Sequence, residues 1–274
     1  MKEINFIVSE SEENMSVKDF LIFKGLSKTI IKKAKIGGIF VCGEQVTVRH
    51  ILKKSNKVKV ILPAPQKERI KPIKIPIKVV YEDDFLLIVD KPKNMPTHPS
   101  RCNSLPTLAN AVSAIMGEDF VFRTINRLDR DTSGLVLIAK DAHTASRLSL
   151  QMRNREITKK YLAIVNGVPT ERTGIIDAPI RRELEGSMKR IVAPDGKEAL
   201  TRYEVLKILG DNALVEVTPL TGRTHQIRVH FSYIGHPLVG DFLYGERTED
   251  GYYLRCHHLC FVHPITCKKI EIKI

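Results

Sequence analysis

One aspartate in the middle of the chain stands among basic residues, in the segment RTINRLDRDTSGLVLIA. Asp129 has Arg127 and Arg130 as close neighbours, and the apolar run at residues 135–139 is typical of a buried strand. Nearby positive charges keep a carboxylate ionised, and nucleophilic or base catalysis needs an ionised carboxylate. Asp129 is therefore the first candidate for chemistry.

The elements around this aspartate indicate a mixed α+β domain that begins near Val79. VVYEDDFLLIVD predicts a hairpin with its turn at residues 82–84, and residues 132–134 suit a tight turn between Asp129 and the buried strand. Asp141 can cap a helix that starts directly after it. Strands and helices follow without regular βαβ alternation, which favours an α+β sheet over a doubly wound one.

A separate small unit precedes this domain. SVKDFLIFKG and SKTIIKKAKIGG predict two short helices, the second with Ser27 as its N-cap and its end at residues 37–38. IFVCGEQVTV and NKVKVIL predict strands. This order resembles the S4 RNA-binding module, which implies a small α/β domain at residues 1–62. Residues 63–78, with four prolines and five basic residues, predict an extended linker to a second domain at 79–274.

The chain is basic, and the excess is densest near its N-terminus. Lys and Arg number 44 against 31 Asp and Glu, a net charge of +13. Residues 1–62 hold 12 Lys and Arg against 6 Asp and Glu, which is +6 of that total. Lys28 and Lys32 lie four apart and share a helix face, with Lys33 beside them. The cluster is either a solvated face or, as the S4 resemblance implies, a set of RNA phosphate contacts.

Five segments in the second domain resemble one enzyme family. RLDRDTSG is similar to HRLDxxTSG, the signature loop of the RluA family of RNA pseudouridine synthases, with Asn126 in place of the usual His. VDKPKNMPTHP resembles the family's KPxGxxxHP segment, with Asn94 where Gly is common. REITKKYLAIVNG, GKEALTRYEVL and PLTGRTHQIRVHFSYIGHPLVGDFLYG follow in the family's order, so the resemblance covers most of residues 79–264.

This resemblance implies a largely antiparallel sheet of the pseudouridine synthase type, an RNA substrate and no cofactor. It makes Asp129 the catalytic carboxylate, which helps to break the N1–C1′ bond either by attack at C1′ or by removal of the 2′ proton. Tyr161 takes or relays the C5 proton once C5 has joined C1′, and Arg228 pairs with Asp129. Asn126 puts the packing of the loop or an RNA contact in question, and not the reaction.

Each of these three roles has a plain alternative. Asp129 could be a structural loop residue, and Tyr161 a strand residue with a solvent-facing hydroxyl. Arg228 could be an exposed strand cation, because the alternation in IRVHF predicts a strand with Arg228 and His230 on one face.

A uridine inside folded RNA must leave its stack before it can react. Arg130, directly after the aspartate, is a candidate to fill the gap in the RNA, and Arg127, His98 and Arg223 are candidates for contacts to phosphate or base. Arg130, His98 and Arg223 can also be read as ordinary surface residues. The domain order is common among family members that modify large-subunit ribosomal RNA, so the resemblance favours ribosomal RNA over transfer RNA. We expect a monomer.

The remaining features restrict the alternatives. Five cysteines without a CxxC pair, a polar N-terminus and the lack of a long apolar run favour a cytoplasmic protein outside membranes. RCHHLCFVHPITC could be read as a zinc site, but it lacks a second ligand pair, so we expect no metal. The chain has no P-loop and no dinucleotide-binding glycine pattern, so we expect no nucleotide cofactor. The rival functions are a non-catalytic RNA-binding protein and a metal-dependent RNA hydrolase.

Overall fold

The computed structural model describes residues 2–26, 28–62, 70–99, 106–117 and 119–274. The chain divides into two compact units, Met1–Glu68 and Arg69–Ile274. Within the described residues, none of the helices has the length and apolar character needed to cross a bilayer.

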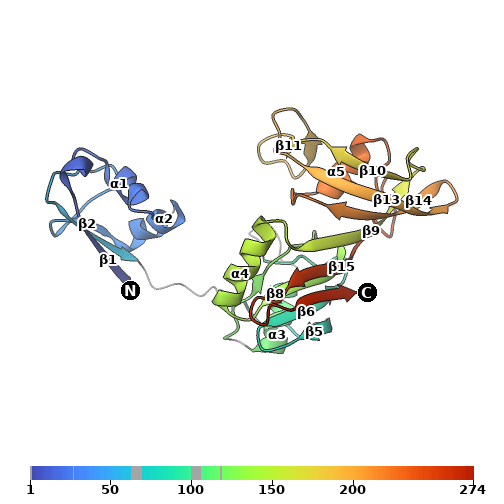
Figure 1. The fold of residues 1–274 in the computed structure, drawn as a ribbon, viewed down its shortest axis with the longest axis horizontal. Coiled ribbons are helices and arrows are strands. Elements are labelled where there is room, and N and C mark those ends of the chain that lie inside the picture. Colours follow the sequence, from blue (N-terminus) through green and yellow to red (C-terminus); the bar gives the residue numbers. More distant parts are fainter. Residues whose placement is uncertain (1, 27, 63–69, 100–105, 118) are drawn as a thin grey trace. The chain divides into compact units, whose positions relative to one another are not determined.

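The first unit is a four-stranded antiparallel sheet with two helices, drawn in blue in Figure 1. Its strand order is β1-β4-β2-β3. The bounds are β1 Lys2–Ile7, α1 Val17–Phe23, α2 Lys28–Gly37, β2 Ile39–Val41, β3 Glu44–Gln45 and β4 Lys57–Leu62. Phe20 and Leu21 of α1 share one buried core with Ile31 and Ala34 of α2, so both predicted helices are confirmed. Ser27, the predicted N-cap, lies outside the described residues.

Strand β1 is an element that we did not predict from the sequence. It pairs along its whole length with β4, from Lys2 opposite Leu62 to Ile7 opposite Lys57. Ile4 and Phe6 pack against the core of the unit from alternate positions of the strand. The pairing joins segments at least 50 residues apart in the chain, so the pattern of residues 2–7 alone does not show that they have a partner strand.

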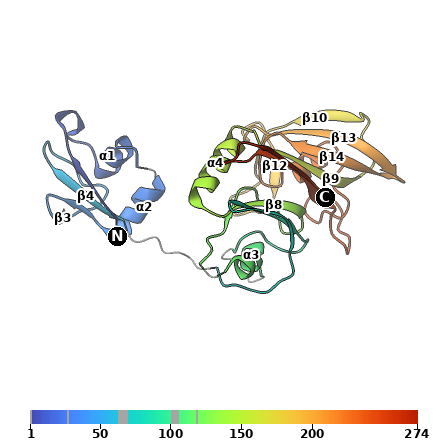
Figure 2. The same cartoon turned by 60° about the horizontal axis from the view of Figure 1, so that its bottom comes forward.

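The second unit is built on one ten-stranded sheet, which Figure 2 shows from a second direction. The main path runs β10-β13-β14-β9-β15-β8-β6-β5, while β16 pairs with β15 and β7 with β8. The bounds are β5 Lys78–Glu82, β6 Leu86–Lys91, β7 Arg123–Thr124, β8 Ser133–Ala139, β9 Thr158–Asn166, β10 Thr173–Asp177, β13 Leu200–Leu209, β14 Asn212–Pro219, β15 Leu254–Val262 and β16 Lys269–Lys273. Among the pairs described in this sheet only β15–β8 is parallel, so the predicted α+β, largely antiparallel class is confirmed.

Three helices and a short ribbon complete this unit. They are α3 Leu108–Met116, α4 Ala142–Arg153, α5 Gln226–Tyr233 and the antiparallel pair β11 Ile180–Arg182 and β12 Arg190–Val192. Figure 1 shows α3 near β5 and β6, and α5 near β10 and β13, towards opposite ends of the sheet. Asp141 caps α4 as predicted, because its Oδ1 accepts hydrogen bonds from the backbone N–H groups of His143 and Thr144.

The predicted strand at IRVHF is wrong, because residues 227–231 lie within α5. Every side chain from Gln226 to Phe231 is buried, so apolar and polar positions carry no information about the period of the element. His225 in the left-handed region begins the helix, with φ 57° and ψ 20°. Arg228 is consequently buried on a helix and is not an exposed strand cation.

The described part of the predicted linker lies along the second unit. Residues 70–77 form no helix or strand, yet Ile70, Ile75 and Ile77 pack against its core. The Nδ2 group of Asn110 in α3 donates to the backbone carbonyl of Lys71 at 2.9 Å. Residues 63–69 lie outside the described residues, and the bounds 1–62, 63–78 and 79–274 remain predictions.

Gly134 allows β8 to approach β15 closely. It follows the loop of Asp129, has φ +111° and pairs in parallel with Cys256 of β15. A Cβ at this position would overlap the backbone carbonyl of Cys256 and lie 2.6 Å from its nitrogen. The glycine of the TSG motif is therefore required by the contact between two central strands.

We expect Gly134→Ala to lower the free energy of unfolding by more than about 3 kcal/mol, because it adds backbone strain to a steric overlap. Urea unfolding of the purified protein measures this. Gly210→Ala is the matched control: Gly210 also has a positive φ, +62°, but nothing lies within 4 Å of its added Cβ. It should cost about 1–2 kcal/mol. Equal losses for the two variants would show that strain alone explains the effect.

Candidate active site

Asp129 lies in the loop between β7 and β8, and Asn126 fastens that loop. The buried Asn126 side chain donates from Nδ2 to the Leu135 carbonyl at 3.0 Å and accepts from the Leu137 N–H at 2.8 Å. Both partners belong to β8. The amide therefore pairs with backbone groups of β8 in the way that a neighbouring strand would. Asn126, the residue that departs from the family motif, thus holds the loop against β8 through two hydrogen bonds.

The other side of the loop is fixed by the segment that follows β6. Thr97 Oγ1 donates to the Leu128 carbonyl at 2.7 Å and accepts from the Leu128 N–H at 3.2 Å. The fully buried Lys91 ammonium donates to the carbonyls of Pro92, Met95 and Arg130 at 2.7–3.0 Å. Asp129 therefore sits between two anchored residues, Leu128 and Arg130.

Burial lowers the pKa of Lys91 to about 8, against which Asp131 and Asp129 act to raise it. The folded protein thus holds this proton less tightly than the unfolded chain, whose lysine titrates near 10.5. At a pH between about 8 and 10.5, folding releases this proton. The free energy of unfolding therefore increases as the pH rises through about 8.

We expect Lys91→Met to lower the free energy of unfolding by about 1–3 kcal/mol at neutral pH, because it leaves buried carbonyls unpaired. Wild type should gain stability relative to the variant as the pH rises from 7 to 10. Urea unfolding at several pH values measures both effects. Lys93→Met, two residues on and half-buried, should change stability by less than about 0.5 kcal/mol. If the difference in free energy of unfolding between wild type and Lys91→Met did not vary with pH, the lowered pKa of Lys91 would be wrong.

Helix α5 is anchored to the sheet by two buried polar side chains. Gln226 Oε1 accepts from Thr221 Oγ1 at 2.8 Å, and its Nε2 donates to the Leu200 carbonyl at 2.9 Å. His230 bridges Thr201 Oγ1 and the Ala178 carbonyl at 2.8 and 2.9 Å. Burial lowers the pKa of His230, so the ring is neutral and donates from one nitrogen only. These contacts set the face of α5 that carries Arg228.

Arg228 connects Asp129 to a second, fully buried carboxylate. Its Nε and Nη2 each donate to Asp241 at 2.6 Å, and its Nη1 lies 3.8 Å from Asp129 Oδ2. The rings of Tyr252 and Tyr244 lie 4.5 and 5.0 Å from the guanidinium carbon. Burial acts to lower the pKa of Arg228, but its bonds to Asp241 and the surrounding negative charges raise it overall. The guanidinium is a fixed cation beside the candidate catalytic carboxylate.

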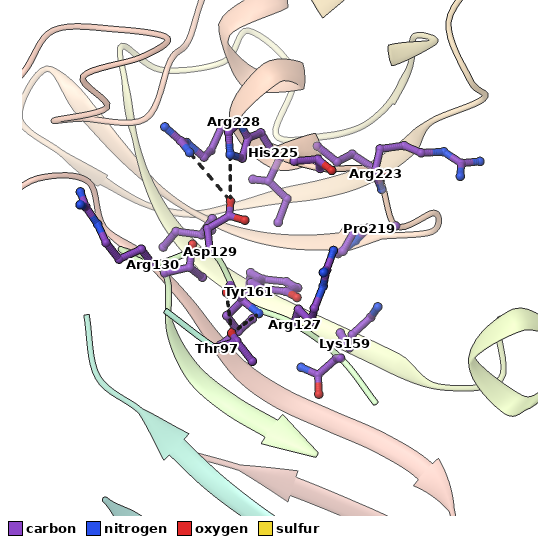
Figure 3. Close-up of a pocket in the computed structure, with 18 of the residues that line it drawn as sticks. Thr97, Arg127, Asp129, Arg130, Lys159, Tyr161, Pro219, Arg223, His225 and Arg228 are labelled. Atoms are coloured by element: carbon purple, nitrogen blue, oxygen red, sulfur yellow. Dashed lines mark hydrogen bonds and ion pairs between the residues drawn. The ribbon is translucent and has the colours of Figure 1, made fainter. Parts of the chain in front are cut away.

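Asp129 and Arg228 line a cavity of about 450 Å³ (Figure 3). Asp129, Tyr161, Arg228, Arg127, Arg130, His98 and Arg223 all line it. Figure 3 shows Asp129 reaching towards Arg228 and His225, with Tyr161 below them. Lys159 lines the same cavity and adds a further cation to it. The structure therefore brings together every site residue that we predicted in the second domain, while the role of each remains a prediction.

Tyr161 lies on β9 and is buried, with 8% of its surface exposed. Burial is the main cause that raises its pKa well above the usual value, and Cys256 and Asp129 add to the shift. The hydroxyl is therefore protonated at neutral pH, and the alternative of a solvent-facing strand tyrosine does not describe it.

The remaining predicted residues are less constrained. Arg130 forms a two-pronged pair with Asp131 at 2.8 and 3.0 Å, and Arg223 donates to the Glu198 carbonyl at 2.8 Å. Arg127 and His98 are exposed at the cavity. Lys32 is exposed on α2 of the first unit, whereas the side chains of Lys28 and Lys33 lie outside the described residues.

The sequence did not predict a role for four residues at or beside the site: Lys91, His225, Asp241 and Tyr252. Lys91, His225 and Asp241 all occur within the segments that resemble the family, so the motifs contained a signal for them. Their functions depend on contacts with Arg130, Asp129 and Arg228, which only the folded chain brings within reach.

The Cys/His stretch forms most of β15 and the turn after it. Its three histidines each face a carboxylate at 3.0–3.1 Å: His257–Glu216, His258–Glu271 and His263–Asp83. Cys256 is buried in the core, and burial raises its pKa to about 12. Within the described residues, no group of three His, Cys, Asp or Glu side chains has the arrangement of a metal site.

The fold and cavity define a class of enzyme: an α+β catalyst that uses a carboxylate beside a fixed arginine, with basic residues suited to an RNA backbone. The family model described as RNA pseudouridylate synthase matches residues 85–233. The chain belongs to this family of isomerases, in agreement with the RluA-type motifs.

Individual relatives support this assignment. YjbO of Bacillus subtilis, named an uncharacterized RNA pseudouridine synthase, is 38% identical over 92% of this chain and 92% of its own length. Ribosomal large subunit pseudouridine synthase D of Zymomonas mobilis is 36% identical over 77% of this chain and 72% of its own. The solved structure of human RNA pseudouridylate synthase domain containing 1 is 30% identical, with a TM-score of 0.61, and covers 73% of this chain and 83% of its own.

Proposed function

We propose that this protein converts uridine to pseudouridine in large-subunit ribosomal RNA. The observation that carries the proposal is the Asp129 carboxylate in the cavity, with Oδ2 facing Arg228 and over a third of its side chain exposed. Relatives named ribosomal large subunit pseudouridine synthase C and D, each 36% identical to this chain, support ribosomal RNA as the substrate.

The reaction is an isomerisation that Asp129 starts at the sugar. The N1–C1′ bond breaks when the carboxylate attacks C1′ or removes the 2′ proton, and both routes need the carboxylate ionised. The uracil then turns and C5 bonds to C1′, which displaces the Asp129 carboxylate in the first route and returns the 2′ proton from Asp129 to C2′ in the second. The C5 proton leaves while N1 gains one. Atoms and charge balance without a cofactor.

Tyr161 acts as a proton relay in this scheme. Because its raised pKa keeps the hydroxyl protonated, it accepts the C5 proton only while it passes its own proton on. A phenolate base would require an ionised tyrosine, which burial disfavours.

The target uridine enters the cavity only after it leaves the RNA stack. We assign Arg130, exposed beside Asp129, to fill the space that the base vacates, and Arg127, His98 and Arg223 to contacts with phosphate or base. The loss of the Arg130–Asp131 pair costs little in this exchange, because half of the Arg130 side chain is exposed to solvent.

We infer that the first unit is an S4-like RNA-binding module and that the protein acts as a cytoplasmic monomer. Two helices on a small sheet and the +6 charge of residues 1–62 support RNA binding by this unit. Lys32 and Lys35 are exposed on α2 and are suited to phosphate contacts.

The proposal is tested by tritium release from RNA labelled at uridine C5. Unmodified large-subunit ribosomal RNA and transfer RNA are offered separately, without metal or nucleotide. We expect release from ribosomal RNA. Release from transfer RNA alone would show that ribosomal RNA is not the substrate. If the protein bound RNA but released tritium from neither, a non-catalytic RNA-binding protein would be favoured.

We expect the double variant Lys32→Glu, Lys35→Glu to raise KM for ribosomal RNA without changing kcat, because these lysines lie outside the catalytic unit. The slope of log affinity against log salt should become shallower by about 2. Filter binding at several salt concentrations measures this. Lys207→Glu with Lys269→Glu is the matched control, since it makes the same charge change at exposed sites of the second unit. Equal effects of both double variants would reject the module's specific role.

A further inference from the structure

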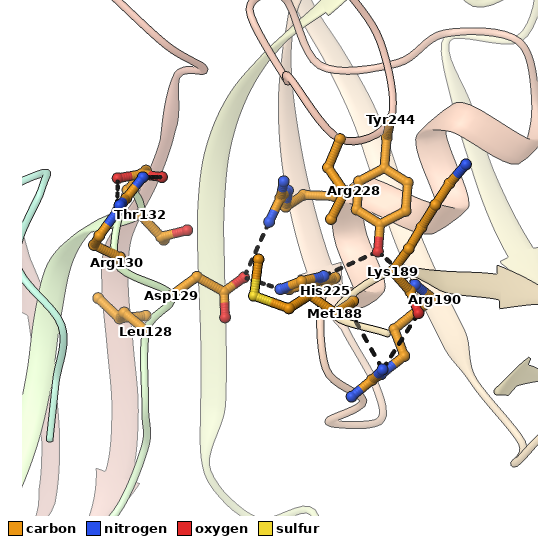
Figure 4. Close-up of polar contacts among 12 residues, drawn as sticks. Leu128, Asp129, Arg130, Thr132, Met188, Lys189, Arg190, His225, Arg228 and Tyr244 are labelled. Carbon is orange, nitrogen blue, oxygen red and sulfur yellow. Dashed lines mark hydrogen bonds and ion pairs between the residues drawn. The ribbon is translucent and has the colours of Figure 1, made fainter. Parts of the chain in front are cut away.

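His225 lies beside the same oxygen of Asp129 that faces Arg228. Its Nε2 is 3.9 Å from Asp129 Oδ2, and Arg228 Nη1 is 3.8 Å from that oxygen (Figure 4). Oδ2 is the Asp129 oxygen nearest to both groups, and no side chain or backbone N–H of the described residues donates a hydrogen bond to Oδ1. One oxygen therefore faces two protein donors, and the other is left for the target nucleotide.

The orientation of the His225 ring is set by Tyr244. The Tyr244 hydroxyl lies 2.9 Å from His225 Nδ1, and the Arg190 N–H donates to the same hydroxyl at 2.9 Å. A backbone N–H can only donate, so the hydroxyl accepts there, and among the described residues Nδ1 is the acceptor that its own proton can reach. The arrangement that uses every donor therefore places the proton of a neutral His225 on Nε2, the nitrogen that faces Asp129.

The backbone holds this ring in a restricted place. His225 has φ 57° and ψ 20°, a left-handed conformation that is uncommon outside glycine, and its carbonyl accepts from the Val229 N–H at 2.9 Å. The ring also packs edge-on against Tyr244, with centroids 5.8 Å apart. Together these contacts fix the direction of Nε2.

The charges that face His225 come from four parts of the unit. They are Asp129 from the catalytic loop, Arg228 from α5, Arg190 from β12, and Asp241 from the segment that also carries Tyr244. Burial is the main cause that lowers the pKa of His225, the two arginines lower it further, and the two aspartates oppose the change. The ring is therefore neutral at pH 7.

We infer that His225 is a positioning residue for Asp129: its Nε2–H, oriented by Tyr244, points at Oδ2 from 3.9 Å and attracts that oxygen electrostatically, so that Oδ1 faces the sugar of the target uridine. A neutral donor aims the carboxylate without a second full positive charge beside it, which would reduce its power as a nucleophile or base. The kinetic consequence rests on the proposed isomerisation by Asp129, whereas the proton position on the ring does not.

Nitrogen-15 spectra of the imidazole rings in the full-length protein test the proton position directly. The signals of His225 are identified by their loss in His225→Gln. We expect the Nε2–H form in wild type and a mixture of both neutral forms in Tyr244→Phe, which removes only the orienting hydroxyl. An Nδ1–H ring in wild type would overturn the inference, whatever RNA the enzyme modifies.

Kinetics on the RNA that wild type modifies test the positioning role. His225→Gln and His225→Met carry the same backbone strain, but only glutamine keeps a donor. We expect methionine to lower kcat by about tenfold to a hundredfold with KM unchanged, and glutamine to restore most of the loss. Equal losses would mean that the side chain only fills space.

The pH profile separates the two titrating groups. Protonation of His225 would place a second cation beside Asp129, so wild type should lose kcat at acidic pH before His225→Gln does. The acid limb of the glutamine variant is therefore expected at lower pH, and coincident limbs would overturn the inference. If wild type released no tritium from any RNA, the proposed function would fail, while the ring spectra would still decide the position of the proton.

Discussion

Asp129→Asn is expected to abolish pseudouridine formation, with a loss of kcat of at least on the order of a thousandfold. Asparagine keeps the shape of the side chain but can neither attack C1′ nor remove the 2′ proton. Because Arg228 remains paired with Asp241, the substitution leaves no buried charge without a partner. Tritium release from C5-labelled RNA measures the activity, and RNA affinity and thermal unfolding should match wild type.

Asp131→Asn provides the matched control for this variant. Asp131 lies two residues away in the same loop and pairs with the half-exposed Arg130. We expect this variant to retain most of the activity, since half of the Arg130 side chain is exposed and the pair therefore contributes about 1 kcal/mol. Full activity of Asp129→Asn, or an equal loss in both variants, would refute the assignment of the catalytic carboxylate.

Asp241→Asn should affect stability and activity together. Asp241 is fully buried, and its replacement leaves the Arg228 guanidinium without its carboxylate partner, which costs about 3–5 kcal/mol. The released guanidinium is also free to move onto Asp129, 3.8 Å away, so we expect kcat to fall. Urea unfolding and tritium release measure the two effects.

Two further variants separate these effects. Glu198→Gln breaks the exposed Arg155–Glu198 pair and should change stability by at most about 1 kcal/mol. Arg228→Met with Asp241→Leu replaces the buried pair with apolar side chains among aromatic rings. This double variant should be more stable than Asp241→Asn but should have no activity, because Asp129 loses its arginine. An active double variant would mean that Arg228 does not act on Asp129.

Helices and strands were predictable where the spacing of apolar residues and a turn or cap residue are both visible in the sequence. The hairpin of β5 and β6 is confirmed, and Asp83 closes its turn by accepting from the N–H groups of Phe85 and Leu86. The helix after Asp141 is confirmed for the same reason, since a cap and a period are both visible in sequence. β1 and α5 were not predicted, because one depends on a distant partner and the other is buried on all sides.

The kind of chemistry was predictable from the chain: a candidate catalytic carboxylate in a loop before a buried strand, a tyrosine and an arginine in motifs of one family, and an excess of basic residues suited to RNA. How that carboxylate is positioned depends on the folded protein. Asp241, His225 and Tyr244 reach Asp129 and Arg228 through contacts between loops, strands and a helix that no local period encodes. The sequence specifies which side chains are present, but the distances between them and their burial are set only when the folded sheet brings separate segments together.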